Sequence, residues 1–265
     1  MRIVSICPSN TEVVDYLGLT SSLVGVDDFS DYPEEVHTLP KLGPDLSIDM
    51  DKVEALQPDL ILASLSVPGM EKNIEELNKR NLPYIVTNPQ SFEDIADDLL
   101  TVGKACGIEE KAVEMQKEFH EKINLLKEAA NKTDHSPELY WEWWPKPVFT
   151  PGKINWLTEL SRLAGAQNVY RDVDLASIQT DWEDVYKRNP DYICLAWVGV
   201  RREKVNPKVV TKRNGWNNLQ AVMNDRILVL EEDLYCRPSP RLLEGALKLG
   251  KILHPQQFGS ITFTT

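Results

Sequence analysis

The side chains that usually perform catalysis form no recognisable constellation in this sequence. Its four histidines (His37, His120, His135 and His254) are far apart, and there is no HExxH, GxGxxG, GxxxxGK[ST] or GxSxG motif. The four cysteines are also dispersed and form no CxxC pair, which argues against a zinc site. We therefore expect a protein that is not an enzyme, with no catalytic residues, no metal site and no catalytic cofactor.

Aromatic side chains are better placed for chemistry, and that chemistry is ligand binding. Trp141, Trp143 and Trp144 fall within four residues, and in a strand the first two share one face while the third takes the other. In open α/β sheets, ligands bind beyond the carboxyl ends of the strands. Aromatic residues that end or follow predicted strands are our candidate ligand contacts: Phe29, Tyr32, Trp143, Trp144, Trp197 and Tyr235. We expect Trp182 and Trp216 to pack locally in the core.

An internal repeat indicates the elements that must position these residues. Residues 47–61 align without a gap with residues 179–193, and the alignment pairs two prolines and several acids. Each copy predicts a short helix ended by Pro58 or Pro190 and then a buried strand, at 60–63 or 192–196. The spacing is far longer than a solenoid period. We therefore predict two similar α/β lobes.

The segment between the two copies predicts one long helix over residues 109–132. It contains no Pro or Gly, and its apolar residues recur at helical spacing. Acids at its start and lysines near its end suit the helix dipole. The helix is either a surface helix of a single domain or a bridge between lobes, and the repeat favours the bridge. The predicted division is a lobe at 1–108, the bridging helix at 109–132 and a lobe at 133–265.

Alternating strands and helices in both halves predict mainly parallel sheets with helices on both faces. Asn10 is the predicted N-cap of the first helix, and residues 144–152 are a predicted loop. The other expected strands are 2–6, 23–26, 84–87, 138–143 and 227–230, and the other expected helices are 11–17, 50–56, 71–80, 92–105, 155–164, 207–212 and 240–253.

Composition limits the partners and leaves the compartment open. The chain has 265 residues, of which 42% are hydrophobic, and a net charge of −12 that would repel nucleic acid. We expect a monomer without a membrane span. The N-terminus leads directly into a strand, with no signal peptide. The protein is therefore expected in the cytoplasm if Met1 is the native start, or outside it at the membrane surface if an export signal was removed.

Several segments in order resemble the cobalamin-binding proteins of ABC importers, in the periplasmic binding protein class that also takes up iron–siderophores and haem. They are Arg2-Ile-Val-Ser-Ile-Cys-Pro-Ser-Asn-Thr-Glu12, Leu23-Val-Gly-Val26 with Ser30-Asp-Tyr-Pro33, Pro58-Asp-Leu-Ile-Leu-Ala63, Phe149-Thr-Pro-Gly152 and Arg237-Pro-Ser-Pro-Arg241. The resemblance implies two Rossmann-like lobes joined by one long α-helix, with a corrinoid bound in the cleft between them. It therefore agrees with the repeat and the predicted bridging helix.

The resemblance also implies roles for particular residues. Tyr32 matches the pocket tyrosine of the family, and Trp143 and Trp197 fall at its pocket aromatic positions. Family members dock on a permease through an acid in each lobe. Glu71 matches the first acid, whereas the second position is Cys236, so Glu232 or its neighbour Glu231 would have to substitute.

Three functions remain in view. The first is capture of cobalamin or a related corrinoid as a transported ligand for an ABC importer permease. The second is an iron–siderophore or haem-binding protein of the same fold, which usually needs several cations facing the ligand. Only Arg201, Arg202 and Arg237 are candidates for that role, and Arg237 is also our candidate polar contact for a corrinoid. The third is a cytosolic corrinoid-binding protein or enzyme that is not coupled to an importer.

Overall fold

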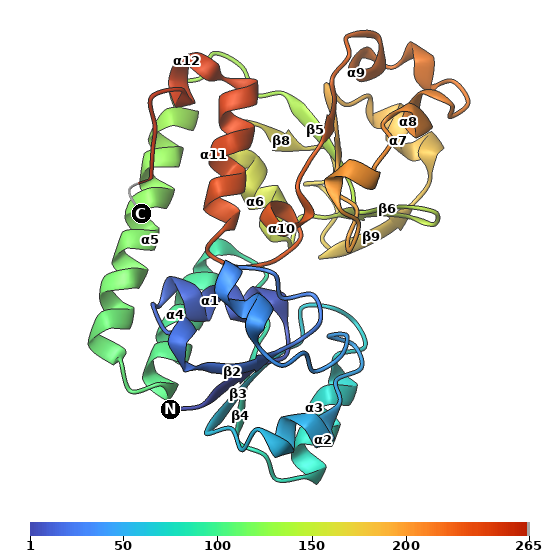
Figure 1. Ribbon diagram of the computed structural model, residues 1–265. Coiled ribbons are helices and arrows are strands. Elements are labelled where there is room, and N and C mark those ends of the chain that lie inside the picture. Colours follow the sequence, from blue (N-terminus) through green and yellow to red (C-terminus); the bar gives the residue numbers. More distant parts are fainter. Residues whose placement is uncertain (264–265) are drawn as a thin grey trace. The chain divides into compact units, whose positions relative to one another are not determined.

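The structure is a computed structural model that describes residues 1–263 (Figure 1). The chain forms two compact units, one comprising residues 1–120 with 238–240 and the other comprising residues 121–237 with the chain from Arg241 onwards. Helix α5 (Glu109–Ala130) leads from the first unit into the second without interruption. Within residues 1–263, no helix combines the length and the apolar composition that crossing a membrane requires.

The first unit is built on a parallel four-stranded sheet, sheet A, with strand order β2-β1-β3-β4. Val4, Ile6, Ile61 and Ala63 form a core with α2 and α3 on one face of this sheet, and α1 and α4 pack together on the other (Figure 1). The elements are β1 (Ile3–Ser5), α1 (Pro8–Tyr16), η1 (Thr20–Ser22), β2 (Leu23–Val26), η2 (Glu34–Thr38), α2 (Met50–Ala55), β3 (Leu60–Ser64), α3 (Glu71–Lys79), β4 (Tyr84–Thr87) and α4 (Phe92–Ala105).

The second unit contains another parallel sheet, sheet B, with strand order β11-β10-β5-β8. Its strands are β5 (Glu138–Glu142), β8 (Gln167–Asn168), β10 (Tyr192–Leu195) and β11 (Ile227–Val229). Its helices are α6 (Trp156–Leu163), α7 (Trp182–Arg188), η3 (Arg202–Lys204), α8 (Lys208–Thr211), η4 (Trp216–Asn218), α9 (Gln220–Met223), α10 (Glu232–Tyr235), α11 (Leu242–Leu253) and α12 (Pro255–Phe258). The predicted fold class, with two α/β lobes and mainly parallel sheets, is therefore confirmed.

A third sheet, sheet C, was not predicted. Residues 144–152, expected to be a loop, instead form most of an antiparallel sheet of β6 (Trp144–Pro145), β7 (Val148–Pro151) and β9 (Ser177–Thr180). The prediction was wrong because three prolines in nine residues suggested irregular structure, yet prolines are tolerated at the ends and edges of sheets. The partner strand β9 also lies more than 20 residues further along the chain, where local pattern gave no sign of it.

The internal repeat has the same local geometry in both units. Asp49 and Asp181 cap α2 and α7, and each accepts hydrogen bonds from two backbone N–H groups of the first helical turn. Asp59 accepts a bond from the N–H of Arg2 at 2.7 Å, and Asp191 accepts one from the N–H of Glu138 at 2.9 Å. Each acid therefore ties the start of its own strand to the start of the neighbouring parallel strand. The repeat is a structural unit.

The predicted N-cap of the first helix is wrong. Helix α1 begins at Pro8, with Cys7 in the capping position, because proline is well accepted in the first turn, where its missing N–H costs nothing. Asn10 lies inside the helix and is buried. Its Nδ2 donates to the carbonyl of Ala63 at 2.9 Å, and its Oδ1 accepts from Thr87 Oγ1 at 2.7 Å. Asn10 thus joins α1 to the ends of β3 and β4.

The Arg237-Pro-Ser-Pro-Arg241 motif is divided between the two units. Residues 238–240 belong to that unit, although both flanking arginines belong to the second. Ser239 is fully buried, and its hydroxyl donates to the buried carboxylate of Glu12 in α1. The chain therefore passes from one unit to the other three times, which the sequence alone did not predict.

Candidate functional site

The second unit brings Trp143 and Trp197 together at the carboxyl ends of two paired strands. Trp143 follows β5 and Trp197 follows β10, and these strands are parallel neighbours. The backbone N–H of Val198 donates to the carbonyl of Trp143 at 3.2 Å, which continues the pairing beyond the strands. Both tryptophans are half-buried. The sequence pattern thus located two aromatic residues at one sheet edge.

A buried carboxylate beneath Trp197 was missed by the sequence analysis. Glu142, the last residue of β5, accepts a hydrogen bond from Trp197 Nε1 at 3.2 Å and one from the Tyr140 hydroxyl at 2.8 Å. Arg213 binds the same carboxylate through both Nη atoms, at 2.6 and 2.7 Å. Burial, followed by the charge of Glu142, raises the pKa of Tyr140 well above its ordinary value. A glutamate among three tryptophans was the available signal, but nothing local indicated its distant partner Arg213.

Trp143 and Trp144 have different surroundings. Trp143 packs against Trp156 of α6, with ring centroids 5.9 Å apart, and Trp141 on the same face donates to Ser161 of α6. Trp144 begins β6 and is 43% exposed, with Nε1 donating to the carbonyl of Lys146. Part of the Trp143 ring therefore stabilises the core, whereas Trp144 offers its ring to solvent.

The structure does not support Tyr235 as a ligand contact. Its side chain is 0% exposed, and its ring packs against Trp141 with centroids 5.5 Å apart. Its hydroxyl donates to the carbonyl of Gly245 in α11 at 2.9 Å. Tyr235 sits in the short helix α10, whose inward face covers the sheet, so its ring points to the interior. We assign it to the core.

Charged residues near the end of β10 are paired with each other. Arg237 donates to Glu232 at 3.2 Å, and Glu232 also accepts a hydrogen bond from the backbone of Gly199. Burial raises the pKa of Glu232 above its ordinary value. The thiol of Cys236 donates to the carbonyl of Ala196 at 3.2 Å. Arg237 and Glu232 therefore lie near Trp197, but each is already engaged by the other.

In the first unit, Phe29 and Tyr32 follow β2 and project into solvent. Phe29 is 51% exposed and Tyr32 is 37% exposed. The loop that carries them is held by Asp27, whose Oδ1 accepts hydrogen bonds from the N–H groups of Phe29 at 2.8 Å and Ser30 at 3.0 Å. Lys41 Nζ also donates to the carbonyl of Ser30 at 2.6 Å. The loop that follows β2 is therefore held by hydrogen bonds and carries two exposed aromatic rings.

Asp27 begins a buried chain of hydroxyl groups at the carboxyl edge of sheet A. Its carboxyl contacts the hydroxyl of Ser30, which lies 2.7 Å from that of Thr11. Thr11 is 2.8 Å from Ser5, which donates to the carbonyl of Cys7. Burial raises the pKa of Asp27 from 3.8 to about 6. Nothing in the sequence distinguished Asp27 from the neighbouring exposed acids.

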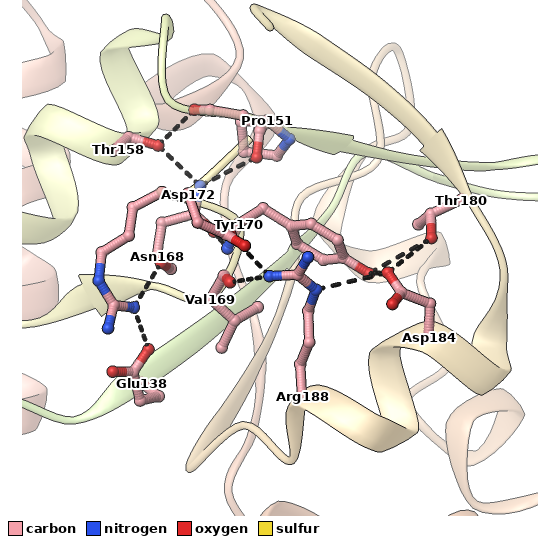
Figure 2. A network of polar contacts seen from close by, with 12 residues as sticks. Glu138, Pro151, Thr158, Asn168, Val169, Tyr170, Asp172, Thr180, Asp184 and Arg188 are labelled. Atoms are coloured by element: carbon pink, nitrogen blue, oxygen red, sulfur yellow. Dashed lines mark hydrogen bonds and ion pairs between the residues drawn. The ribbon is translucent and has the colours of Figure 1, made fainter. Parts of the chain in front are cut away.

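A second polar cluster lies at the opposite, N-terminal end of β5 (Figure 2). It borders an open hollow of about 490 Å³. Arg171 donates to Glu138 at 2.5 Å, and Arg188 donates to Asp172 at 2.7 Å. The hydrogen bond from Arg188 lowers the pKa of Asp172. Each arginine here faces an acid, and the cluster lies away from the strand ends where the tryptophans gather. We assign it a structural role.

In the part of the chain that the structure describes, no group of three or more His, Cys, Asp or Glu side chains is arranged to hold a metal ion. The groups brought together at the strand ends are instead aromatic rings, with buried polar groups behind them. Such an arrangement suits binding of a large, mainly apolar ligand.

Comparison with known proteins places these features in a family. Residues 3–234 match the family described as "Periplasmic binding protein". The chain is 33% identical over 267 residues to an uncharacterized ABC transporter substrate-binding lipoprotein, YvrC, of Bacillus subtilis, covering 97% of this chain and 81% of the relative. It is 26% identical over 249 residues to the vitamin B12-binding protein of Vibrio parahaemolyticus, covering 94% and 87%.

Solved structures show the same fold. The chain is similar to a possible iron-binding (periplasmic solute-binding) protein from Staphylococcus epidermidis, with a TM-score of 0.81 and 27% identity, covering 96% of this chain and 98% of that one. The match over most of the chain agrees with the two parallel α/β units. The chain therefore belongs to the periplasmic binding protein family.

Proposed function

We propose that this protein is the substrate-binding component of an ABC importer and that its solute is cobalamin or a related corrinoid. The observation that carries the proposal is that the aromatic residues at the strand ends lie beside charged side chains that are already bound to opposite charges. Trp197 donates a hydrogen bond to the carboxylate of Glu142, which also binds Arg213. The nearby Arg237 is bound by Glu232. Aromatic surface whose neighbouring charges are paired in this way suits a large planar ligand. The likeness to a vitamin B12-binding protein supports the same assignment.

The proposed contacts follow strand ends in each unit. Phe29 and Tyr32 supply exposed rings in the first unit, and Trp143, Trp144 and Trp197 supply rings in the second. Arg237 is kept as a polar contact, with its orientation fixed by Glu232. Binding would come from burying apolar ring surface, with a few polar groups setting the orientation of the ligand.

An iron chelate is the second candidate, because a possible iron-binding protein from Staphylococcus epidermidis shares the fold at 27% identity. Anionic chelates are recognised by free cations. Arg237 is engaged by Glu232, and Arg202 donates to Glu231 at 3.1 Å. Two of the three arginines that could recognise an anion are thus already neutralised. This pairing favours the corrinoid.

The first prediction concerns ligand class. After incubation and desalting, the protein should retain the colour of cyanocobalamin and should not retain haem or ferric citrate, because two of the three arginines that could recognise an anion, Arg202 and Arg237, are bound by acids. Tryptophan fluorescence should fall on addition of cyanocobalamin beyond the fall seen for N-acetyltryptophanamide at the same concentrations, which corrects for absorption by the ligand. Retention of haem or ferric citrate in preference to cyanocobalamin would move the iron chelate to first place.

The second prediction concerns the binding surface. Replacing Trp197 with Ala should weaken cyanocobalamin binding at least ten-fold, about 1.4 kcal/mol, because a ring that covers the ligand is lost. Isothermal titration of each variant would measure the change. Tyr186→Ala is the matched control, since Tyr186 is also an exposed aromatic residue of the second unit but lies in α7. Equal affinities for Trp197→Ala and wild type would remove Trp197 from the site.

The proposal also includes docking on a permease through Glu71. This acid is exposed at the start of α3, where its carboxylate accepts a hydrogen bond from the N–H of Gly69 at 2.7 Å. Glu232 was the predicted second docking acid, but its side chain is 16% exposed and bound to Arg237. Its neighbour Glu231 is bound by Arg202 and Lys248. We therefore rest the docking proposal on Glu71.

A further inference from the structure

Glu142 has every acceptor position of its carboxylate occupied. Its Oε1 accepts from Trp197 Nε1 and from Arg213 Nη2, and its Oε2 accepts from the Tyr140 hydroxyl and from Arg213 Nη1. A carboxylate has about four lone-pair sites, so these four donors use them all. The residue is 0% exposed and therefore cannot touch a ligand.

Arg213 is held from three sides. Besides Glu142, its guanidinium lies 4.7 Å from the centroid of the Trp182 ring and 4.4 Å from that of Trp216. Trp216 Nε1 in turn donates to the carbonyl of Trp182 at 3.2 Å. The position of the guanidinium is therefore set by two rings as well as by the acid.

Two of the three partners of Glu142, Trp197 and Arg213, mark the ends of one chain segment. Residues 197–213 begin just after β10 and end just after α8. At the end of this segment, the side chain of Arg213 reaches back to Glu142 in β5 of sheet B. One carboxylate therefore binds the side chain at the start of this segment and the side chain at its end. Because the indole has a single N–H, its bond to Glu142 also fixes the rotation of the Trp197 ring.

Stability alone does not require such a pair. Buried ion pairs can often be exchanged for apolar residues of similar size without loss of stability, and in some proteins such a pair serves to specify one geometry. Here the specified geometry includes the ring that we assign to the ligand. Building on the corrinoid-binding function proposed above, we infer that Glu142, held by Arg213, is the positioning residue that fixes Trp197 for ligand binding.

The experiment uses a double variant, Glu142→Met/Arg213→Met, which removes both charges and keeps similar side-chain lengths. The full chain is labelled with 5-fluorotryptophan, and the ¹⁹F resonance of Trp197 is identified by its loss in Trp197→Phe. In the double variant we expect that resonance to shift and broaden, and cyanocobalamin affinity to fall at least ten-fold while the protein remains folded. In a Trp197→Phe background, which has no N–H to position, the same two substitutions should leave affinity unchanged.

The matched control is Glu138→Gln, which disrupts the ion pair with Arg171 at the other end of the same strand. It should move neither the Trp197 resonance nor the affinity. Glu142→Gln, which keeps the shape of the side chain, serves as the milder variant should the double substitution not fold, with smaller changes in the same direction expected.

Three results are decisive. Wild-type affinity and an unmoved Trp197 resonance in a folded double variant would overturn the inference and leave the ion pair a purely structural role. An equal loss of affinity with Trp or Phe at position 197 would also overturn it, because the effect would not pass through the indole. A displaced resonance in the double variant, together with unchanged affinity in that variant and in Trp197→Ala, would uphold the positioning of the ring and reject instead the ligand contact proposed for Trp197.

Discussion

Replacing Arg213 alone with Met is expected to lower the free energy of unfolding by about 3–5 kcal/mol. The substitution leaves the Glu142 carboxylate buried and without its counter-charge, since the side chains of Arg213 and Glu142 are 2% and 0% exposed. It also removes the cation that lies between the rings of Trp182 and Trp216. Urea unfolding at neutral pH, followed by circular dichroism, would measure the loss.

The matched comparison is Arg171→Met, which breaks an ion pair with Glu138 on the same strand. Those side chains are 40% and 34% exposed, so water can solvate the remaining acid, and the expected loss is about 1 kcal/mol or less. Similar losses for the two substitutions would contradict the argument. So would a Glu142→Met/Arg213→Met protein as unstable as Arg213→Met, because removing both charges should restore most of the stability.

Replacing Asp27 with Asn is expected to remove a stability loss that the wild-type protein suffers between about pH 4 and pH 6. Burial raises the pKa of Asp27 from 3.8 to about 6, so the folded protein holds this proton over a range in which the unfolded chain releases it. The wild type therefore loses stability as pH rises through that range. At about 1.4 kcal/mol for each pH unit, the loss approaches about 3 kcal/mol.

The hydrogen-bond chain explains why Asn can substitute. Successive contacts join Asp27 to Ser30, Ser30 to Thr11, Thr11 to Ser5 and Ser5 to the carbonyl of Cys7, and Ser30 donates to Asp27. When Asp27 is protonated, it can instead donate its own hydrogen to Ser30, whose hydroxyl then turns to Thr11, and the amide of an asparagine would donate to Ser30 in the same way. The Asp27→Asn variant should therefore preserve the chain of hydrogen bonds at every pH.

Urea unfolding of both proteins at intervals from pH 4 to pH 8 would test this expectation. The two should have similar stability at pH 4, and Asp27→Asn should be more stable at pH 8. Asp28→Asn is the control, because Asp28 is exposed and its contact with the N–H of Gly43 is one that Asn can retain. Parallel pH profiles for wild type and Asp27→Asn, or an Asp27→Asn protein that is less stable than wild type at pH 8, would contradict the assignment.

Local pattern in the sequence determined most of the architecture. Alternating apolar runs and turn residues located β2, β4 and α4 at their observed bounds, and the absence of Pro and Gly from residues 109–130 located α5. The repeat located two equivalent helix–strand units, capped by Asp49 and Asp181. These features depend on interactions between residues close in the chain, so a single sequence reveals them.

The aromatic part of the candidate site was also accessible from the sequence, because ligands gather where parallel strands end. That rule located Trp143 and Trp197 on neighbouring strands. It was wrong for Tyr235, since proximity in sequence to a strand end does not determine which way a side chain points in the short helix that follows. It also gave no sign of sheet C, whose strands β7 and β9 are distant in sequence.

Only the tertiary structure decided how charge is arranged around the aromatic residues. Glu142 and Arg213 are 71 residues apart, and Asp27 is linked through Ser30 to the hydroxyls of Thr11 in α1 and Ser5 in β1. Composition shows that an acidic chain contains such groups, but not which of them are buried or paired. The strength of an ion pair and the pKa of a carboxyl depend on burial and on partners brought together by folding. The sequence therefore predicted where a ligand could bind, while the fold determined which charges remain free to meet it.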